Sequence, residues 1–147
     1  MTINSFTGKY RWLSNFTYVK VLLDGQEFPS VENAYQAAKY IEKNKEYRYP
    51  FTLCTPSEAK KLGKVIPLSD DWGDRKLIVM YNLLKQKFRP GSYFASLLVE
   101  TGHEDIIEGN YWGDTFWGIY RGRGENHLGK LIMDIRSDLS MRKLNNE

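Results

Sequence analysis

The first apolar pattern in the chain alternates from residue to residue and predicts a β-hairpin over residues 17–28, TYVKVLLDGQEF. The alternating residues run into Asp24-Gly25, a dipeptide that tolerates the positive φ angles of a two-residue turn. Pro29 follows and ends the second strand, because proline has no amide hydrogen to donate to a neighbouring strand.

After Ser30 the apolar period becomes that of an α-helix, with Ser30 placed to cap it. The residues that recur at helical spacing are Val31, Ala34, Tyr35, Ala38 and Ile41. Three polar residues at positions i, i+4 and i+7 form a second stripe about a quarter-turn away: Glu32, Gln36 and Lys39. The segment therefore predicts an amphipathic helix with a polar row beside its buried face.

Further along, residues 42–54 show no period and predict a loop. The stretch TPSEAKKLG predicts a helix start, with Thr55 as N-cap, Pro56 at the first helical position and Glu58 completing a capping box. Three more amphipathic stretches predict helices. They run from Ser69 to about Phe88, over residues 92–102, and from Asn126, the expected cap, through HLGKLIMDIRSDL. DIIEGN, residues 105–110, predicts a brief strand.

Strands followed by several helices favour an α+β fold. We expect a single domain over residues 1–147, in which a small N-terminal hairpin or sheet packs with four to six helices. The chain lacks a phosphate-binding P-loop, a dinucleotide fingerprint and a GxSxG motif.

Composition narrows the function further. Aromatic residues make up 14% of the chain, including 4 Trp and 10 Tyr, and the formal net charge is +3. This mild basicity suits a phosphorylated ligand but is weak support for a nucleic-acid platform. One Cys and two His are too few for a structural zinc site, and the longest apolar runs have four residues. We expect a cytoplasmic protein without signal peptide, cofactor or metal.

Several residues are candidates for chemistry. Glu32 either occupies a favourable position in the first helical turn or serves as a functional carboxylate, and Lys39 on the same stripe can bind an anion. Trp72 either packs onto the following helix or provides a platform for a ligand. Arg75 can pair with one of the neighbouring acids, Asp70, Asp71 or Asp74, or reach a phosphate.

The stretch EGNYWGDTFWG, residues 108–118, places Asp114 between Trp112 and Trp117 without any helical or strand period. Glycines on either side permit tight bends, so the indoles are expected to form walls of a site around the carboxylate. The following loop, GIYRGRGEN, carries Arg121 and Arg123 and leads into a helix N-terminus. Its amides and arginines can hold a phosphate, although the same composition describes a solvated hairpin tip.

Six motifs in order resemble one family over nearly the whole chain. They are FTGKYRWLSNF, DGQEFPSVENAYQAAK, W-x-x-R-x-x-x-x-M followed by KF, TG with IIEGN, D-x-FWG, and G-x-N-x-LGKLIMDIR. This series is similar to the YbiA-like N-glycosidases of the NADAR superfamily. The resemblance implies a metal-free α+β hydrolase that cleaves the bond between ribose and a base or amine.

The resemblance also implies site residues. Glu32, Trp72 and Asp114 match the active-site set, Asn15 and Lys39 match pocket-lining positions, and Asn126 and Gly129 match the entry of the last helix. Arg121 and Arg123 depart from the lighter glycine-rich loop of the family. In the expected mechanism Glu32 and Asp114 share the acid and base roles, the indoles stack on the base, and Lys39 and Arg75 hold phosphate.

The expected substrate is a small phosphorylated N-riboside, such as a ribosylamino-pyrimidine phosphate of riboflavin synthesis, bound by a monomer. One alternative is an ADP-ribosyl hydrolase that removes ADP-ribose from guanine in nucleic acid. Another is a module that binds ADP-ribose or an NAD derivative without turnover.

Overall fold

The computed structural model of the protein describes residues 1–145. The chain folds into two compact units, and its N-terminal segment belongs to the same unit as its C-terminal part. We call residues 15–87 the middle unit, and residues 1–14 with the segment from residue 88 onward the terminal unit.

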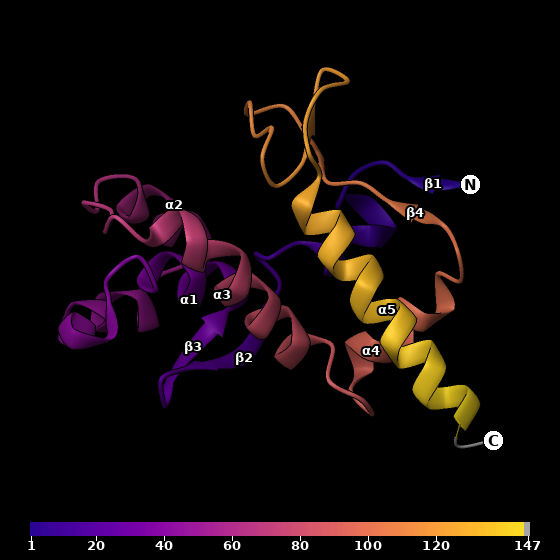
Figure 1. Ribbon diagram of the computed structural model, residues 1–147, viewed down its shortest axis with the longest axis horizontal. Coiled ribbons are helices and arrows are strands. Elements are labelled where there is room, and N and C mark those ends of the chain that lie inside the picture. The colour runs from indigo at the N-terminus through magenta and orange to yellow at the C-terminus, as the bar shows by residue number, and fades with distance from the viewer. Residues whose placement is uncertain (146–147) are drawn as a thin grey trace. The chain divides into compact units, whose positions relative to one another are not determined.

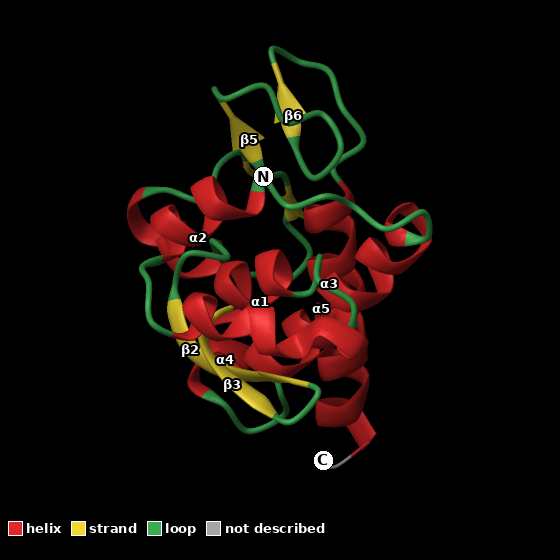
Figure 2. Cartoon of the chain, turned by 90° about the vertical axis from the view of Figure 1, so that its left-hand side faces the viewer, coloured by secondary structure: helices red, strands yellow, loops and turns green. Residues whose placement is uncertain are grey.

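The middle unit contains one hairpin and most of the predicted helices (Figure 1). Its elements are β2 Tyr18–Leu23, β3 Gln26–Ser30, α1 Val31–Ala37, the 3-10 helix η2 Glu42–Thr52, α2 Pro56–Gly63 and α3 Trp72–Lys87. The predicted hairpin is confirmed: β2 and β3 pair antiparallel, Leu23 lies opposite Gln26, and Asp24 and Gly25 have φ angles of 49° and 80°. Both strands are seen in yellow in Figure 2.

Helix α1 lies in the core of the middle unit, in contact with β2, β3, η2, α2 and α3. Ser30 caps it as predicted, because the Ser30 hydroxyl accepts a hydrogen bond from the Asn33 amide at 3.0 Å. The helix ends at Ala37, however, and every one of its residues is buried. The expected amphipathic helix reaching Ile41 was therefore wrong, since neighbouring elements cover its polar row as well as its apolar face.

Residues 42–52 form η2 rather than the predicted loop, and Arg48 and Phe51 of η2 are buried. The capping box of α2 is confirmed by reciprocal hydrogen bonds between Thr55 and Glu58, at 3.0 and 3.1 Å. Helix α3 confirms the long predicted helix between Ser69 and Phe88, with Met80, Leu83 and Leu84 buried along it.

The described part of the terminal unit contains short strands and two α-helices. Its elements are β1 Thr2–Ile3, the 3-10 helix η1 Gly8–Leu13, α4 Tyr93–Glu100, β4 Asp105–Ile106, β5 Gly109–Asn110, β6 Ile119–Tyr120 and α5 His127–Asn145. β1 pairs in parallel with β4, and α5 packs on β4 and α4. The brief strand predicted over residues 105–110 is split into β4 and β5, which pair with different partners. The α+β class with a small hairpin and several helices is confirmed.

Candidate active site

Glu32 lies in the first turn of α1 and is only 8% exposed. Two hydrogen-bonded features fix the position of Glu32 at the start of α1. The Ser30 cap starts the helix, and the Glu32 amide donates a hydrogen bond of 3.1 Å to the carbonyl of Asn15. A carboxylate in this setting has lost most of its water, so it needs polar partners within the protein.

Gln36 supplies such a partner. It lies one turn after Glu32 on the same helix, is 6% exposed, and donates a hydrogen bond from Nε2 to Glu32 Oε2 at 3.0 Å. Because the carboxamide is neutral, this bond orients the carboxylate without cancelling its charge. The sequence placed Gln36 on the polar stripe but did not mark it as a site residue.

Lys39 follows just beyond the end of α1, where its amide donates to the Gln36 carbonyl at 3.2 Å. The Lys39 ammonium donates to the carbonyl of Gly63, the last residue of α2, also at 3.2 Å. Burial lowers the pKa of Lys39, the charge of Glu32 opposes that shift, and nearby Lys76 adds to it. Glu32 therefore favours the charged form of Lys39, against the effect of burial on its pKa.

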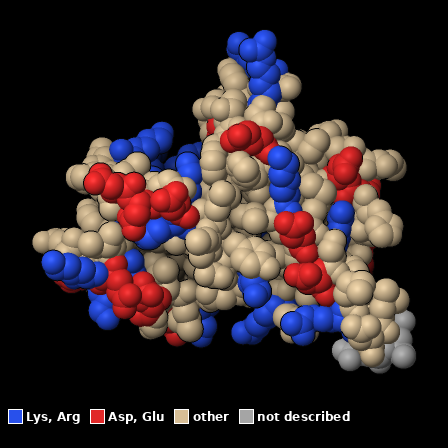
Figure 3. Space-filling view, viewed as in Figure 1, with Lys and Arg blue, Asp and Glu red and all other residues tan. Residues whose placement is uncertain are grey.

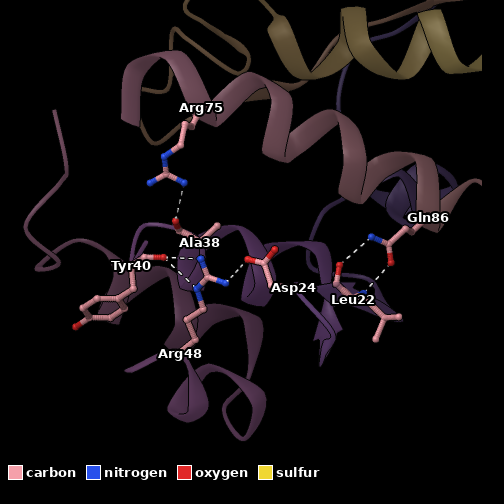
Figure 4. A network of polar contacts seen from close by, with 7 residues as sticks. All are labelled: Leu22, Asp24, Ala38, Tyr40, Arg48, Arg75 and Gln86. Carbon is pink, nitrogen blue, oxygen red and sulfur yellow. Dashed lines mark hydrogen bonds and ion pairs between the residues drawn. The ribbon is translucent and has the colours of Figure 1, made fainter. Parts of the chain in front are cut away.

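Two arginines hold the backbone on either side of Lys39 (Figure 4). Arg75 donates from one guanidinium nitrogen to the Ala38 carbonyl at 3.4 Å. Arg48 donates from Nε and a terminal nitrogen to the Tyr40 carbonyl, at 3.0 and 2.7 Å. The carbonyls flanking Lys39 are thus each bound to a guanidinium group.

Arg48 was missed in the sequence because it lies in a stretch without a period. It is 2% exposed and forms an ion pair of 2.7 Å with Asp24 at the hairpin turn. A buried arginine in an apparent loop leaves no local signal, since its partners come from the hairpin and from the segment after α1.

Arg75 already has protein partners. Its Nε lies 3.2 Å from Asp71 Oδ1, and a terminal nitrogen donates to the Ser69 hydroxyl at 3.3 Å. The predicted pairing with a neighbouring acid is confirmed. The alternative use of Arg75, as a phosphate ligand, stays a prediction.

Trp72, at the start of α3, is 5% exposed. The centroids of the Trp72 and Tyr35 rings lie 5.4 Å apart. The guanidinium carbon of Arg75 lies 5.1 Å from the centroid of the Trp72 ring. This burial favours the packing interpretation of Trp72 over the ligand platform, although its role in binding stays a prediction.

Two buried acceptors in the middle unit have no donor. Asn15 is 9% exposed; its Nδ2 lies 3.6 Å from the Met80 sulfur, and its Oδ1 has no hydrogen-bond partner. Gln36 Oε1 is likewise buried without a donor. A buried acceptor without a donor costs free energy, on the order of 1–3 kcal/mol, unless ordered water or a ligand supplies the donor.

In the terminal unit, Asp114 is half-buried and stabilises a turn. Its Oδ1 accepts hydrogen bonds from the amides of Phe116 and Trp117, at 3.1 and 2.8 Å. Asn110 holds the same turn by accepting from the Asp114 amide at 3.0 Å and donating to the Asp114 carbonyl at 2.9 Å. One carboxylate oxygen of Asp114, Oδ1, is thus bound to the backbone, and neither the Phe116 nor the Trp117 hydrogen bond involves Oδ2.

The indoles around Asp114 differ in exposure. Trp112 is 48% exposed and lies edge-on against Tyr111 at 5.2 Å, whereas Trp117 is half-buried and packs edge-on against Phe116 at 4.8 Å. The two indoles are thus paired with different aromatic neighbours, and a joint role as walls around Asp114 stays a prediction.

The basic loop after β6 is a hairpin tip. Tyr120 and Arg123 exchange backbone hydrogen bonds of 2.8 and 3.0 Å, and the residues between them, Arg121 and Gly122, have φ angles of 51° and 77°. Arg121 and Arg123 are exposed, and the Arg121 guanidinium lies 5.1 Å from the Tyr120 ring centroid. This is the solvated hairpin tip that the sequence allowed as an interpretation.

The amides at the start of α5 are already bonded to protein carbonyls. Those of Asn126, His127 and Leu128 donate to the carbonyls of residues 118, 116 and 117. For these three amides the phosphate hypothesis was wrong, because the preceding segment folds back onto the helix N-terminus. Phosphate binding by Arg121 or Arg123 stays a prediction.

Asn126 was expected to cap α5, and this too was wrong. Its side chain instead accepts from the Glu108 amide at 3.0 Å and donates to the Ile106 carbonyl at 3.0 Å. A Cβ atom on Gly129 would overlap that same Ile106 carbonyl, so the glycine permits the close approach of strand and helix. Both residues shape the entry of the last helix, as the resemblance implied.

The predicted site residues are divided between the units. Asn15, Glu32, Lys39, Trp72 and Arg75 belong to the middle unit, and the others belong to the terminal unit. The structure brings Glu32 and Lys39 together with Gln36 and Gly63. The convergence of Glu32 and Asp114 on one sugar carbon stays a prediction.

Three further features concern other kinds of site. Nowhere in residues 1–145 do three His, Cys, Asp or Glu side chains gather as metal ligands would. Over the same residues, none of the helices has the length and apolar character needed to cross a membrane. An open hollow of about 470 Å³ lies on the hairpin, where Tyr18, Phe28 and Thr52 contribute to its lining, and no predicted site residue lines it.

These features define an α+β protein whose first helix carries a buried glutamate and glutamine, with a half-buried lysine just beyond its end. The NADAR domain model matches residues 4–140, so the match spans both compact units. The chain belongs to the NADAR domain family.

Two bacterial relatives and one solved structure match this chain over most of their length. N-glycosidase YbiA of Escherichia coli (strain K12) is 30% identical over 143 residues, which cover 95% of this chain and 88% of YbiA. An N-glycosidase of Nostoc punctiforme is 31% identical over 135 residues, covering 88% of this chain and 86% of the relative. The NMR structure of E. coli YbiA matches with a TM-score of 0.82, covering 98% of this chain and 86% of that one.

A plant protein matches over part of its length. The chloroplastic riboflavin biosynthesis protein PYRR of Zea mays is 32% identical over 124 residues, which cover 76% of this chain and 20% of PYRR.

Proposed function

We propose that this protein hydrolyses the N-glycosidic bond between ribose C1′ and a nitrogen of a base or amine. The names of the E. coli and Nostoc punctiforme relatives, both N-glycosidases, support this reaction class. The observation that carries the proposal is the hydrogen bond from Gln36 to Glu32 in a buried polar row, because a catalytic carboxylate has to be held in one direction near the reacting carbon.

In the proposed reaction the C1′–N bond breaks with its electron pair on nitrogen, and positive charge develops on the sugar. Glu32 stabilises this charge and takes a proton from the attacking water. The hydroxyl of the water joins C1′, and the proton is passed on to the leaving nitrogen, so one water is consumed and Glu32 is ionised again. Asp114, the second proposed carboxylate, holds the ribose hydroxyls through Oδ2.

Lys39 is the proposed ligand of the substrate phosphate. Its ammonium is held by a single backbone carbonyl, which a phosphate oxygen can replace or join. Arg75 donates to Ala38 and Ser69 and lies against Asp71, so its proposed part is to fix the backbone beside Lys39. The name of the maize relative favours a riboflavin-pathway ribosylamino-pyrimidine phosphate as the substrate.

The test is mass spectrometry of the protein incubated with a panel of phosphorylated N-ribosides, with free base and ribose phosphate as products. Glu32→Gln should reduce kcat by ~10²-fold or more while the melting temperature stays close to wild type. Glu46→Gln, an exposed glutamate of η2, removes the same charge and should leave kcat unchanged. Equal kcat in Glu32→Gln and Glu46→Gln would exclude Glu32 from the chemistry.

A second candidate, removal of ADP-ribose from guanine in nucleic acid, is favoured by one feature of the terminal unit. β5 and β6 pair in parallel, with Asn110 opposite Tyr120, so Tyr111 and Arg121 leave the pair at the same end. Tyr111 is 87% exposed and Trp112 is 48% exposed. Exposed aromatic rings beside arginines are typical of surfaces that bind single-stranded nucleic acid.

Basic side chains gather at the tip of the loop after β6 in Figure 3, while acidic and basic side chains are interspersed over much of the face drawn. Fluorescence anisotropy with a single-stranded oligonucleotide tests the candidate. Arg121→Gln and Arg123→Gln should weaken binding and its salt dependence, and Arg142→Gln, an exposed arginine near the end of α5, is the matched control. Equal binding by all three variants would reject it.

Incubation with ADP-ribosylated DNA beside a ribosylamino-pyrimidine phosphate then separates the two hydrolase candidates. Binding of ADP-ribose in calorimetry without release of any ribose phosphate would instead identify a binding module.

A further inference from the structure

Gly63 contacts the side chains of both Lys39 and Gln36, although the sequence presents it only as the glycine that ends α2. Its carbonyl accepts the hydrogen bond from the Lys39 ammonium at 3.2 Å. Its α-carbon faces the Gln36 side chain so closely that a Cβ atom would overlap Gln36 Oε1 and lie 2.5 Å from Gln36 Cδ. No ordinary side chain fits between α2 and Gln36.

The space that Gly63 leaves open decides where the Gln36 carboxamide can lie. With Oε1 against the Gly63 α-carbon, Nε2 points to Glu32 Oε2 at 3.0 Å. The same placement explains why Oε1 is buried without a hydrogen-bond donor, since a C–H group covers it. The cost of that unpaired acceptor is tolerated because the other end of the amide holds a buried carboxylate.

We propose that Gly63 is a positioning residue for the acid–base site: its missing side chain seats Gln36 against Glu32, and its carbonyl holds Lys39. The catalytic consequence rests on the proposed hydrolase function, whereas the positions of Gln36 and Glu32 can be measured without it. The relation involves α1, Lys39 just after it, and α2, all within the middle unit.

Gly63→Ala is the direct test, with Gly73→Ala as its control. A Cβ on Gly73, in the first turn of α3, meets nothing within 4 Å, so that variant should keep both activity and melting temperature. Gly63→Ala should lower kcat about 10- to 100-fold, as expected for a displaced catalytic group, with a smaller change in KM. The acidic limb of its kcat profile should move to higher pH, because a carboxylate that loses a hydrogen-bond donor is more easily protonated.

A double variant separates positioning from packing. Gln36→Ala in the Gly63→Ala background removes the overlap, so the melting temperature should recover while kcat stays low. If kcat recovers together with the melting temperature, Gly63 serves packing alone and the inference is wrong.

NMR of the Gln36 side-chain amide gives a readout that does not depend on turnover. In the wild type its Nε2 protons should be protected from exchange and should respond to protonation of Glu32, and Gly63→Ala should abolish both effects. A wild type with these signals but no hydrolysis of any N-riboside would overturn the proposed function and leave the positioning relation intact. A Gly63→Ala protein that retains the signals and the wild-type kcat would overturn the inference itself.

Discussion

Arg48→Met tests how strongly the segment that carries Lys39 is held in place. Arg48 is 2% exposed and makes three short contacts: two hydrogen bonds to the Tyr40 carbonyl and the ion pair with Asp24. Methionine fills much of the same volume and removes every donor. The main loss is at Tyr40, whose carbonyl is left without either donor.

The magnitude follows from the exposure of the partners. Tyr40 is half-buried, so loss of both donors to its carbonyl costs up to about 1–3 kcal/mol, and hydrogen bonds from a charged donor contribute about 1.5–3 kcal/mol each without being additive. Asp24 is 36% exposed, so water largely replaces its lost partner and the ion pair adds little. Removing a buried guanidinium also relieves its own desolvation. We therefore expect Arg48→Met to reduce the free energy of unfolding by about 2–4 kcal/mol.

Urea denaturation, followed by circular dichroism and tryptophan fluorescence, measures this change. Asp24→Asn is the matched comparison, because asparagine keeps an acceptor oxygen and tolerates the positive φ angle of this turn; it should cost about 1 kcal/mol or less. A loss below about 1 kcal/mol in Arg48→Met, or an equal loss in both variants, would refute the assignment of the stabilisation to the Tyr40 carbonyl.

Three further predictions concern single residues. Burial lowers the pKa of Lys87 to about 7. Unfolded chains therefore bind a proton that the native protein lacks between about pH 7 and the ordinary lysine value, and stability should rise with pH across that window; in Lys87→Met, thermal melts from pH 7 to 10 should show this rise abolished. Trp72→Ala should lower the free energy of unfolding by about 3–5 kcal/mol because the ring is buried; a variant that loses ligand affinity at unchanged stability would restore the platform interpretation. Asp114→Asn keeps an oxygen for the amides of Phe116 and Trp117 and should retain its melting temperature while losing activity, whereas Asp114→Ala should lower both; full activity in Asp114→Asn would remove the carboxylate from the proposed mechanism.

The elements that the sequence predicted correctly depend on neighbours along the chain. The Asp24-Gly25 turn, the Ser30 cap and the Thr55–Glu58 capping box each join residues no more than a few positions apart. Such contacts need no partner from a distant part of the chain, and their residue types are restrictive. For the same reason the sequence placed Glu32 and Gln36 on one stripe, and the structure joins these two side chains by a hydrogen bond.

The predictions that failed concern groups whose partners are distant in sequence. Asn126 is an acceptable cap by residue type, yet its side chain bonds the backbone of residues 106–108. The amides at the start of α5 suit a phosphate, yet carbonyls of residues 116–118 occupy them. No local pattern reveals such competition.

By itself the sequence determined the α+β class, the hairpin, most of the helix starts and the polar stripe of Glu32 and Gln36 on the first helix, because these follow from periodicity and short-range hydrogen bonding. Only the tertiary structure decided which polar groups are buried and what holds them. Arg48 binds the Tyr40 carbonyl next to Lys39, and Gly63 packs against Gln36. The physical reason is that burial and hydrogen-bond satisfaction depend on the elements that surround a side chain, and those elements meet only when the chain has folded.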